Sequence, residues 1–267
     1  MGAAFRVIPY EVVPLERLGM PDIVRTFANV PRGLVLVTGP TGSGKSTTLA
    51  SLIDVVNAER QCHIMTVEDP IEFVHHSKKA LVNQREVGAD TSGFGRALVS
   101  ALRQDPDVIL VGEMRDLETI STAITAAETG HLVYGTLHTQ DAAQTVDRII
   151  DVFPGDQQPQ VRIQLANSLQ GVVTQQLVPT IDGRGRAVAS EIMISNTAIR
   201  ALIRDGKIHQ IHNAMMAGRR QGMQKMDDSL ADLVRRGLVS PEEARRRAQN
   251  AEEFDRAMGA GAPAPAR

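Results

Sequence analysis

Gly39-Pro-Thr-Gly-Ser-Gly-Lys45-Ser46 is the stretch of this 267-residue chain that decides its fold. It fits the pattern G-x-x-x-x-G-K-[ST] and stands between an apolar run at 34–38 and a helical pattern at 46–57. Glycines let the backbone wrap around phosphate groups, and the N–H groups at the start of the following helix point towards them. The alternative, a glycine-rich turn without a ligand, is disfavoured because strand and helix patterns flank the motif.

Each position of this loop has an expected task. We expect Lys45 to reach the β- and γ-phosphates of a bound nucleotide, the Ser46 hydroxyl to hold Mg²⁺ and Thr47 to bond the α-phosphate. The predicted nucleotide-binding residues are therefore Gly39, Thr41, Gly42, Ser43, Gly44, Lys45, Ser46 and Thr47.

The pattern continues outward from the loop as an alternation of strands and helices. Apolar runs at 34–38, 63–68, 108–111 and 132–136 predict strands buried on both faces, and the stretches at 46–57, 94–102, 117–128 and 142–151 predict helices. This alternation predicts an α/β fold with a mostly parallel sheet covered by helices. Further on we predict a helix at 161–169, strands at 172–178 and 187–194, and helices at 197–204, 208–217, 227–236 and 241–249. Ser240, Pro241 and Glu243 give the last helix a capping box at its start.

Acidic residues follow two of the predicted strands. Glu113 comes after the run at 108–111, the place where P-loop enzymes have a carboxylate that reaches the Mg²⁺ shell. Glu68-Asp69-Pro70-Ile71-Glu72 follows the strand at 63–68, and Pro70 would turn the chain across the carboxyl edge of the sheet, where ligands bind. One of these acids could orient or deprotonate an attacking water. A solvated acidic turn explains the second cluster equally well from spacing alone.

The histidines divide into one candidate and several ordinary positions. His138 follows the predicted strand at 132–136, at its carboxyl end. This position suits a sensor of the γ-phosphate, although a histidine there is more often structural. His209 and His212 could share a helix face, but we identify no cysteine or carboxylate that completes a metal set with them.

Composition excludes several classes of protein. The chain has 29 basic and 31 acidic residues, 3% aromatic residues and no Trp, so we expect no nucleic-acid partner. Cys62 is the single cysteine, which excludes a disulfide framework and a multi-cysteine zinc site. The apolar runs span only a few residues, so we predict no bilayer-spanning segment, and we expect a cytoplasmic protein.

Four motifs together resemble a known family. The stretch Leu102-Arg-Gln-Asp-Pro-Asp-Val-Ile-Leu-Val-Gly-Glu-Met-Arg-Asp116 is similar to the signature of type II/type IV secretion ATPases. Thr66-Val-Glu-Asp-Pro-Ile-Glu72 resembles their aspartate box, and Gly135-Thr-Leu-His138-Thr139 their histidine box. With the phosphate loop these motifs stand in the family's order, and the resemblance runs from about residue 5 to 254. Within the family the chain is most similar to the PilT-like retraction ATPases of type IV pili, on stretches at 71–79, 81–86, 198–204 and 222–227.

The resemblance implies a fold and a mechanism. It implies a RecA-like P-loop ATPase core followed by a helical carboxyl-terminal extension, with Lys45 and Ser46 binding ATP and Mg²⁺. It further implies that Glu72 is the catalytic glutamate, Glu113 the Walker B acid that contacts the metal, and His138 a sensor that couples hydrolysis to movement. We accordingly expect an entry segment at 1–32, the core at 33–195, a helical region at 196–257 and a disordered tail at 258–267.

The same resemblance implies the setting in which the chain works. Members of the family act as homo-hexamers, so we expect a ring at the cytoplasmic face of the inner membrane, docked on the pilus platform protein, powering pilus retraction and twitching motility. PilT-like proteins carry a PAS-like domain before the segment that begins here at Met1; since its basic residues reach the nucleotide, we expect this chain alone to bind ATP but to hydrolyse it poorly.

Two alternatives stay open within the family. A pilus assembly or type II secretion ATPase is one, although such relatives usually carry two Cys-x-x-Cys pairs that form a zinc knob. This chain has only Cys62, and we expect it to bind no zinc. The other is a nucleotide-binding subunit with little hydrolysis of its own, which the presence of both Glu72 and Glu113 disfavours.

Overall fold

A seven-stranded sheet forms the centre of the chain. The computed structural model describes residues 11–259, and its strands lie in the order β3-β2-β4-β5-β1-β6-β7. Six of them run parallel, and β7 pairs antiparallel with β6. Their bounds are β1 Gly33–Thr38, β2 His63–Glu68, β3 Leu81–Glu86, β4 Val108–Val111, β5 Leu132–Leu137, β6 Leu169–Pro179 and β7 Arg186–Ile194. This confirms the predicted α/β fold with a mostly parallel sheet.

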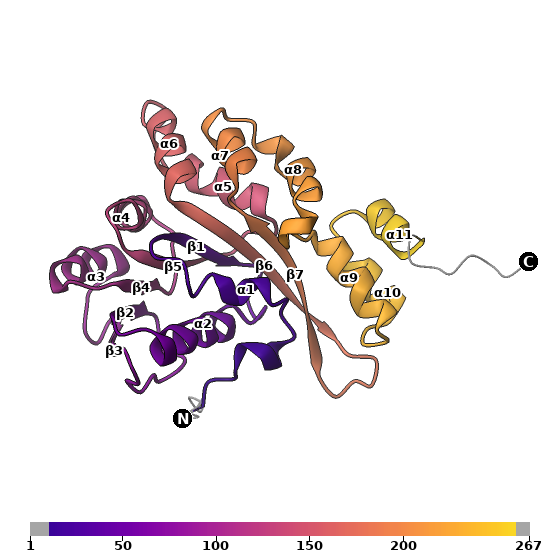
Figure 1. The fold of residues 1–267 in the computed structure, drawn as a ribbon, viewed down its shortest axis with the longest axis horizontal. Helices are drawn as coiled ribbons and strands as arrows, with labels where there is room; N and C mark the ends of the chain where they lie inside the picture. The colour runs from indigo at the N-terminus through magenta and orange to yellow at the C-terminus, as the bar shows by residue number, and fades with distance from the viewer. Residues whose placement is uncertain (1–10, 260–267) are drawn as a thin grey trace, which may run out of the picture.

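Helices cover both faces of this sheet, as Figure 1 shows. In the described part they are α1 Ile23–Thr26, α2 Lys45–Glu59, α3 Phe94–Ala101, α4 Leu117–Glu128, α5 Ala142–Asp151, α6 Gln158–Ser168, α7 Thr197–Arg204, α8 Ile211–Ala217, α9 Met226–Arg235, α10 Pro241–Arg247 and α11 Ala251–Gly259, with 3-10 turns at Leu15–Leu18, Leu102–Gln104, Ile208–Gln210 and Arg219–Gln221. No helix in this part of the chain is both long enough and apolar enough to cross a membrane.

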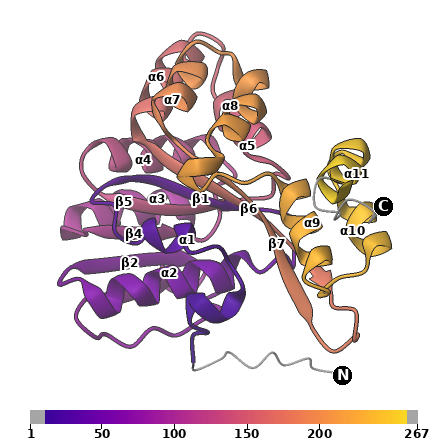
Figure 2. The ribbon, with the colours of Figure 1, turned by 45° about the vertical axis from the view of Figure 1, so that its right-hand side comes forward.

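Three groups of buried residues hold these layers together. The first joins one face of the sheet to α3 through α8, and the second joins the other face to α1 and α2. The third lies beyond the far ends of β6 and β7, where α9, α10 and α11 pack (Figure 2). Since the strands are buried on both faces, every side chain of β1, β4 and β5 is buried, which is why these segments read as continuous apolar runs in the sequence.

Side-chain caps determine where several of the helices begin. The side chains of Asp116, Asp141, Asn196 and Ser240 each accept the backbone N–H of the residue three positions on. Only half of the predicted capping box forms at Ser240, because the Glu243 carboxylate accepts a bond from Arg247 at 2.7 Å.

Strand β3 and helices α1 and α11 were not predicted from the sequence. Strand β3 carries the residues Leu81-Val-Asn-Gln-Arg-Glu86 at the edge of the sheet, with no fully buried side chain, so it lacks the apolar run that reveals the other strands. Helix α11 continues through Gly259, so the prediction of a disordered tail is wrong for 258–259, and its remainder at 260–267 lies outside the described residues. The predicted entry segment contains a 3-10 turn and α1, and its residues 1–10 also lie outside. Finally, the helix predicted at 161–169 ends at Ser168, and Leu169 begins β6.

One charged side chain lies in the core on β7. Glu191 has no exposed surface, and its Oε1 accepts the backbone N–H of Ala142 at 2.7 Å. Burial raises the pKa of this carboxyl to about 7, with a smaller contribution from Asp141 on α5, while Lys225 acts in the opposite direction. His212 on α8 faces the same carboxyl. The native protein therefore binds a proton here at pH values where the unfolded chain has lost it.

This burial predicts a pH-dependent stability. Because the native pKa is raised, the contribution of Glu191 is fully present below the unfolded pKa and is lost as the pH rises towards about 7. Glu191→Gln keeps an acceptor for Ala142 and removes the titration. We expect the variant to gain stability relative to the wild type between pH 5 and pH 8, by on the order of 2–3 kcal/mol. Urea unfolding in EDTA buffer at both pH values measures the difference; identical pH dependence in the two proteins would contradict it.

Candidate active site

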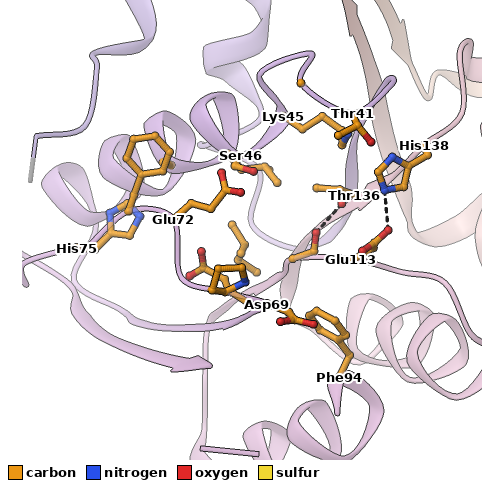
Figure 3. A pocket seen from close by; sticks show the side chains of 18 residues that line it. Thr41, Lys45, Ser46, Asp69, Glu72, His75, Phe94, Glu113, Thr136 and His138 are labelled. Atoms are coloured by element: carbon orange, nitrogen blue, oxygen red, sulfur yellow. Dashed lines mark hydrogen bonds and ion pairs between the residues drawn. The ribbon is translucent and has the colours of Figure 1, made fainter. Parts of the chain in front are cut away.

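A pocket at the carboxyl edge of the sheet gathers the residues that the sequence singled out. Its cavity has a volume of about 190 Å³ and lies at the carboxyl ends of β1, β2, β4 and β5. Lys45, Glu72, Glu113 and His138, the four candidate catalytic residues, all line it, and Thr41, Gly42 and Ser46 of the loop do so as well. Figure 3 shows the Glu72 carboxylate pointing into this pocket, on the side of Ser46. The structure thus brings together positions that are up to 97 residues apart, from Thr41 to His138.

The loop after β1 has a backbone that glycine accommodates. Gly39, Gly42 and Gly44 have φ angles of 134°, 77° and 89°, which residues with a Cβ rarely adopt. At Gly39 a Cβ would also lie 2.2 Å from the carbonyl oxygen of Gln175. Helix α2 begins directly after this loop, at Lys45, and the hydroxyl of Ser43 is buried with no hydrogen-bond partner among the described residues. The N–H groups at the start of a helix favour an anion at this place.

The Lys45 ammonium lies between the loop and two carboxylates. Its Nζ donates to the carbonyl oxygens of Gly39 at 2.9 Å and Pro40 at 3.1 Å. Burial lowers the pKa of Lys45, while the charges of Glu113 and Glu72 raise it. Both glutamates are therefore close enough to act on the ammonium, although they come from different strands of the sheet.

The loop that carries Glu113 is fixed on both of its sides. The Gly112 N–H donates to the carbonyl of Val67 at 2.7 Å, and the Thr136 hydroxyl donates to the Gly112 carbonyl at 2.5 Å. The Glu113 carboxylate, 22% exposed, accepts a bond from Nε2 of His138 at 2.6 Å and another from Nε of Arg115. The candidate sensor and the candidate metal-binding acid are thus directly hydrogen-bonded (Figure 3).

The segment that carries Glu72 is held by the edge strand β3. Gln84 accepts the N–H of His75 at 2.8 Å and donates to the carbonyl of Phe73 at 2.8 Å, which fixes the backbone immediately after Glu72. Glu86 accepts the N–H of Ile71 at 3.0 Å, immediately before Glu72. Two polar side chains of one strand therefore bracket the candidate catalytic glutamate.

This bracket predicts a positioning role for Gln84. We expect Gln84→Ala to lower the turnover number about tenfold and to leave the nucleotide Kd within about twofold, because misplacing a group by ~1 Å costs up to ~10²-fold in rate. Asn83→Ala is the matched control, since its amide faces the His63 ring at 2.9 Å and does not contact the Glu72 segment. Steady-state phosphate release with a separate nucleotide-binding titration distinguishes the two parameters. Equal losses in both variants would contradict the role.

Several side chains that support the pocket were missed from the sequence. Gln175 on β6 donates to the Ser43 carbonyl at 2.7 Å and so buttresses the phosphate loop from the neighbouring strand. Glu68, which the sequence already placed in the acidic cluster after β2, accepts bonds from Thr66 at 2.6 Å and from the missed Gln84 at 3.1 Å, and burial raises its pKa. One signal existed for Gln175, a polar residue inside the apolar run at 172–178. For Gln84 no comparable signal was available, because β3 itself was not predicted.

Comparisons with known proteins identify the family to which the chain is similar. Residues 6–261 match the family model described as "Type II/IV secretion system protein". A twitching motility protein of Neisseria gonorrhoeae is 60% identical over 252 residues, 94% of this chain and 67% of that protein. The type IV pilus retraction ATPase PilT of Pseudomonas aeruginosa is 58% identical over 253 residues, 95% of this chain and 73% of that protein.

A solved structure shares the fold as well. The crystal structure of the pilus retraction motor PilT with bound ADP superposes with a TM-score of 0.89 at 52% sequence identity, covering 94% of this chain and 71% of that one. The chain thus spans about two thirds to three quarters of the length of these relatives.

Proposed function

The chain belongs to the type II/IV secretion system protein family and is a PilT-like member of it. On that premise we propose that it hydrolyses ATP to power the retraction of type IV pili, which produces twitching motility. The observation that carries the proposal is that Lys45, Glu72 and Glu113 line one pocket at the start of α2. Relatives described as a retraction ATPase and as a twitching motility protein, each near 60% identity, support this direction of movement over assembly.

In this proposal the loop binds the phosphates of ATP. Its backbone N–H groups and the start of α2 face the phosphate chain, Lys45 neutralises the β- and γ-phosphates, and Thr47 bonds the α-phosphate. The buried Ser43 hydroxyl, which lacks a partner within the described chain, supports a polar ligand next to the loop. The related PilT motor was solved with bound ADP, which supports nucleotide binding by this chain.

The pocket also suits Mg²⁺. Four acidic residues line it: Glu68, Asp69, Glu72 and Glu113. Lys45 is the one lysine or arginine among its lining residues, so negative charge is in excess there. Carboxylate and hydroxyl oxygens are the ligands that Mg²⁺ prefers, so the Glu113 carboxylate and the Ser46 hydroxyl would hold the ion. When bound, Mg²⁺ neutralises charge on the phosphate oxygens.

The remaining groups act on the water and the γ-phosphate. Glu72 points into the pocket and is assigned to orient the attacking water and to accept its proton. His138, hydrogen-bonded to Glu113, is assigned to report the state of the γ-phosphate to the strand that carries it, β5. Catalysis in this class consists mainly of positioning and charge neutralisation, which the fixed loop of Glu113 and the bracketed segment of Glu72 provide.

The wider assignments follow the same premise. We assign 33–195 to the RecA-like core, 196–257 to the carboxyl-terminal helical region and 1–32 to an entry segment. We further propose that six copies form the motor and that it docks on the inner-membrane platform protein of the pilus, at the cytoplasmic face.

Two measurements on the purified protein test the enzyme and the ring together. Phosphate release should require both ATP and Mg²⁺ and should not respond to single-stranded DNA, which a DNA-translocating relative would need. Light scattering should show a mass near six subunits in the presence of nucleotide. Because this chain alone is expected to hydrolyse ATP slowly, its phosphate release is compared with that of Lys45→Ala. ATP binding with phosphate release no faster than in Lys45→Ala would instead support a nucleotide-binding subunit with little hydrolysis of its own.

A further inference from the structure

A second cluster of ionisable side chains lies outside the nucleotide pocket. Asp141 begins α5, Glu191 lies on β7 and His212 lies on α8, and one ligating atom from each lies within 4.8 Å of the other two. Asp141 is only three residues beyond His138 in the chain, whereas His212 belongs to the helical region at 196–257. The sequence does not reveal this set, because 50 and 21 residues separate its members.

The Glu191 carboxylate is the clearest sign of a ligand here. The side chain has no exposed surface, and one oxygen, Oε1, accepts the N–H of Ala142 at 2.7 Å. The second oxygen, Oε2, is buried and has no side-chain or backbone partner of good hydrogen-bond geometry among the residues that the structure describes. The backbone of Met226 lies near this carboxyl and favours its charged form. A buried acceptor without a partner is costly, and a cation beside it removes that cost.

The surrounding charges favour a cation over an anion. Asp141 is 8% exposed, and its Oδ1 lies 4.0 Å from Nε2 of His212. Asp147, further along α5, is close enough to Asp141 and Asp151 for their charges to raise its pKa, and the charge of Arg162 acts against them. Lys225 is a lysine whose charge acts on Glu191, and its ammonium is already paired with the Glu253 carboxylate.

The ligand types indicate which cation. One imidazole nitrogen with two carboxylates suits a divalent transition-metal ion such as Zn²⁺, whereas Mg²⁺ and Ca²⁺ prefer oxygen ligands alone. Zinc binds these atoms at about 2.0–2.2 Å, which places neighbouring ligand atoms roughly 3.3–3.5 Å apart. The 4.0 Å distance between Oδ1 of Asp141 and Nε2 of His212 therefore exceeds this spacing by about half an ångström. The imidazole is 33% exposed, so solvent can supply a fourth ligand.

We propose that Asp141, Glu191 and His212 bind a divalent transition-metal ion of the Zn²⁺ class, completed by water. The ion would join the start of α5, the core strand β7 and helix α8. It would thereby tie the carboxyl-terminal helical region to the chain segment that leaves His138. This site is distinct from the Mg²⁺ place beside Ser46 and Glu113 and from the four-cysteine knob that the single Cys62 excludes.

Zinc titration of the EDTA-treated, dialysed protein against a chromophoric chelator tests the site. Asp141→Asn keeps the cap of α5, since Asn caps helices as well as Asp does, but removes the charge. His212→Gln removes the imidazole from a partly exposed position of α8. His209→Gln, an exposed histidine of the preceding 3-10 turn, is the matched control.

We expect one Zn²⁺ per chain in the wild type and in His209→Gln, and at least tenfold weaker binding in both ligand variants, because losing even a group that only supports a ligand costs ~10–100-fold. Saturating Zn²⁺ should also raise the Tm of the wild type and of the control by a few degrees more than that of the variants. The proposal is overturned if the wild type takes up no stoichiometric zinc, or if both ligand variants bind it as tightly as the wild type does.

Discussion

Lys45→Ala is expected to reduce ATP-dependent phosphate release to background and to weaken Mg-ATP binding by roughly 10- to 100-fold. The ammonium is half-buried beside the loop, where the charges of Glu113 and Glu72 act on it, and its removal leaves the phosphates without this neutralising charge. Hydrogen bonds to charged groups contribute about 1.5–3 kcal/mol, which gives this range of affinity. Calorimetry or a fluorescent ATP analogue measures binding, and phosphate release measures turnover.

Lys79→Ala is the matched control for this prediction, because Lys79 is exposed and lies outside the pocket. Circular dichroism of both variants checks that the fold is intact. If Lys45→Ala binds Mg-ATP and turns it over like the wild type, the assignment of the loop to phosphate binding is wrong.

Glu72→Gln is expected to lower turnover by ~10²–10⁴-fold while nucleotide affinity stays within about threefold, because a group that orients or deprotonates water contributes to the rate and little to binding. The amide is nearly isosteric with the carboxylate and leaves the Gln84 and Glu86 bracket around the segment unchanged. Glu242→Gln, on the exposed face of α10, serves as the control.

Glu113→Gln should differ from Glu72→Gln in a measurable way. Its carboxylate is the proposed Mg²⁺ ligand, so the variant should need a higher Mg²⁺ concentration for half-maximal turnover, whereas the Mg²⁺ requirement of Glu72→Gln should not change. Near-wild-type turnover in Glu72→Gln, with the loss confined to Glu113→Gln, would move the catalytic role to Glu113.

The parts of the fold that the sequence predicts well are those whose burial is uniform. β4 was predicted with its observed bounds because all four of its side chains are buried, and α5 because its apolar positions repeat at helical spacing. β3 has no such pattern, because an edge strand that is partly exposed can be built from polar residues. The sequence does not predict α11, because only Phe254 among its nine residues is buried and no apolar pattern at helical spacing results.

The pocket shows the same limit at the level of single residues. Lys45 and Glu113 could be found because local motifs place them next to a strand end. Gln84 and Gln175 could not, because their roles depend on which strands become neighbours in the sheet, and no local pattern encodes that. The set of Asp141, Glu191 and His212 exists only once α5, β7 and α8 pack together. Motifs therefore predict the groups proposed to do chemistry, and tertiary structure reveals the groups that hold them in place.

Pilus number and surface movement in a strain deleted for this gene test the central claim most directly. Because a retraction motor withdraws pili that another machine extends, we predict that the deletion strain carries more surface pili than its parent in electron micrographs and does not twitch. Complementation with the wild-type gene should restore both properties, and complementation with Lys45→Ala should restore neither. A deletion strain without surface pili would contradict retraction and indicate assembly, and one that twitches normally with an unchanged number of pili would contradict the account as a whole.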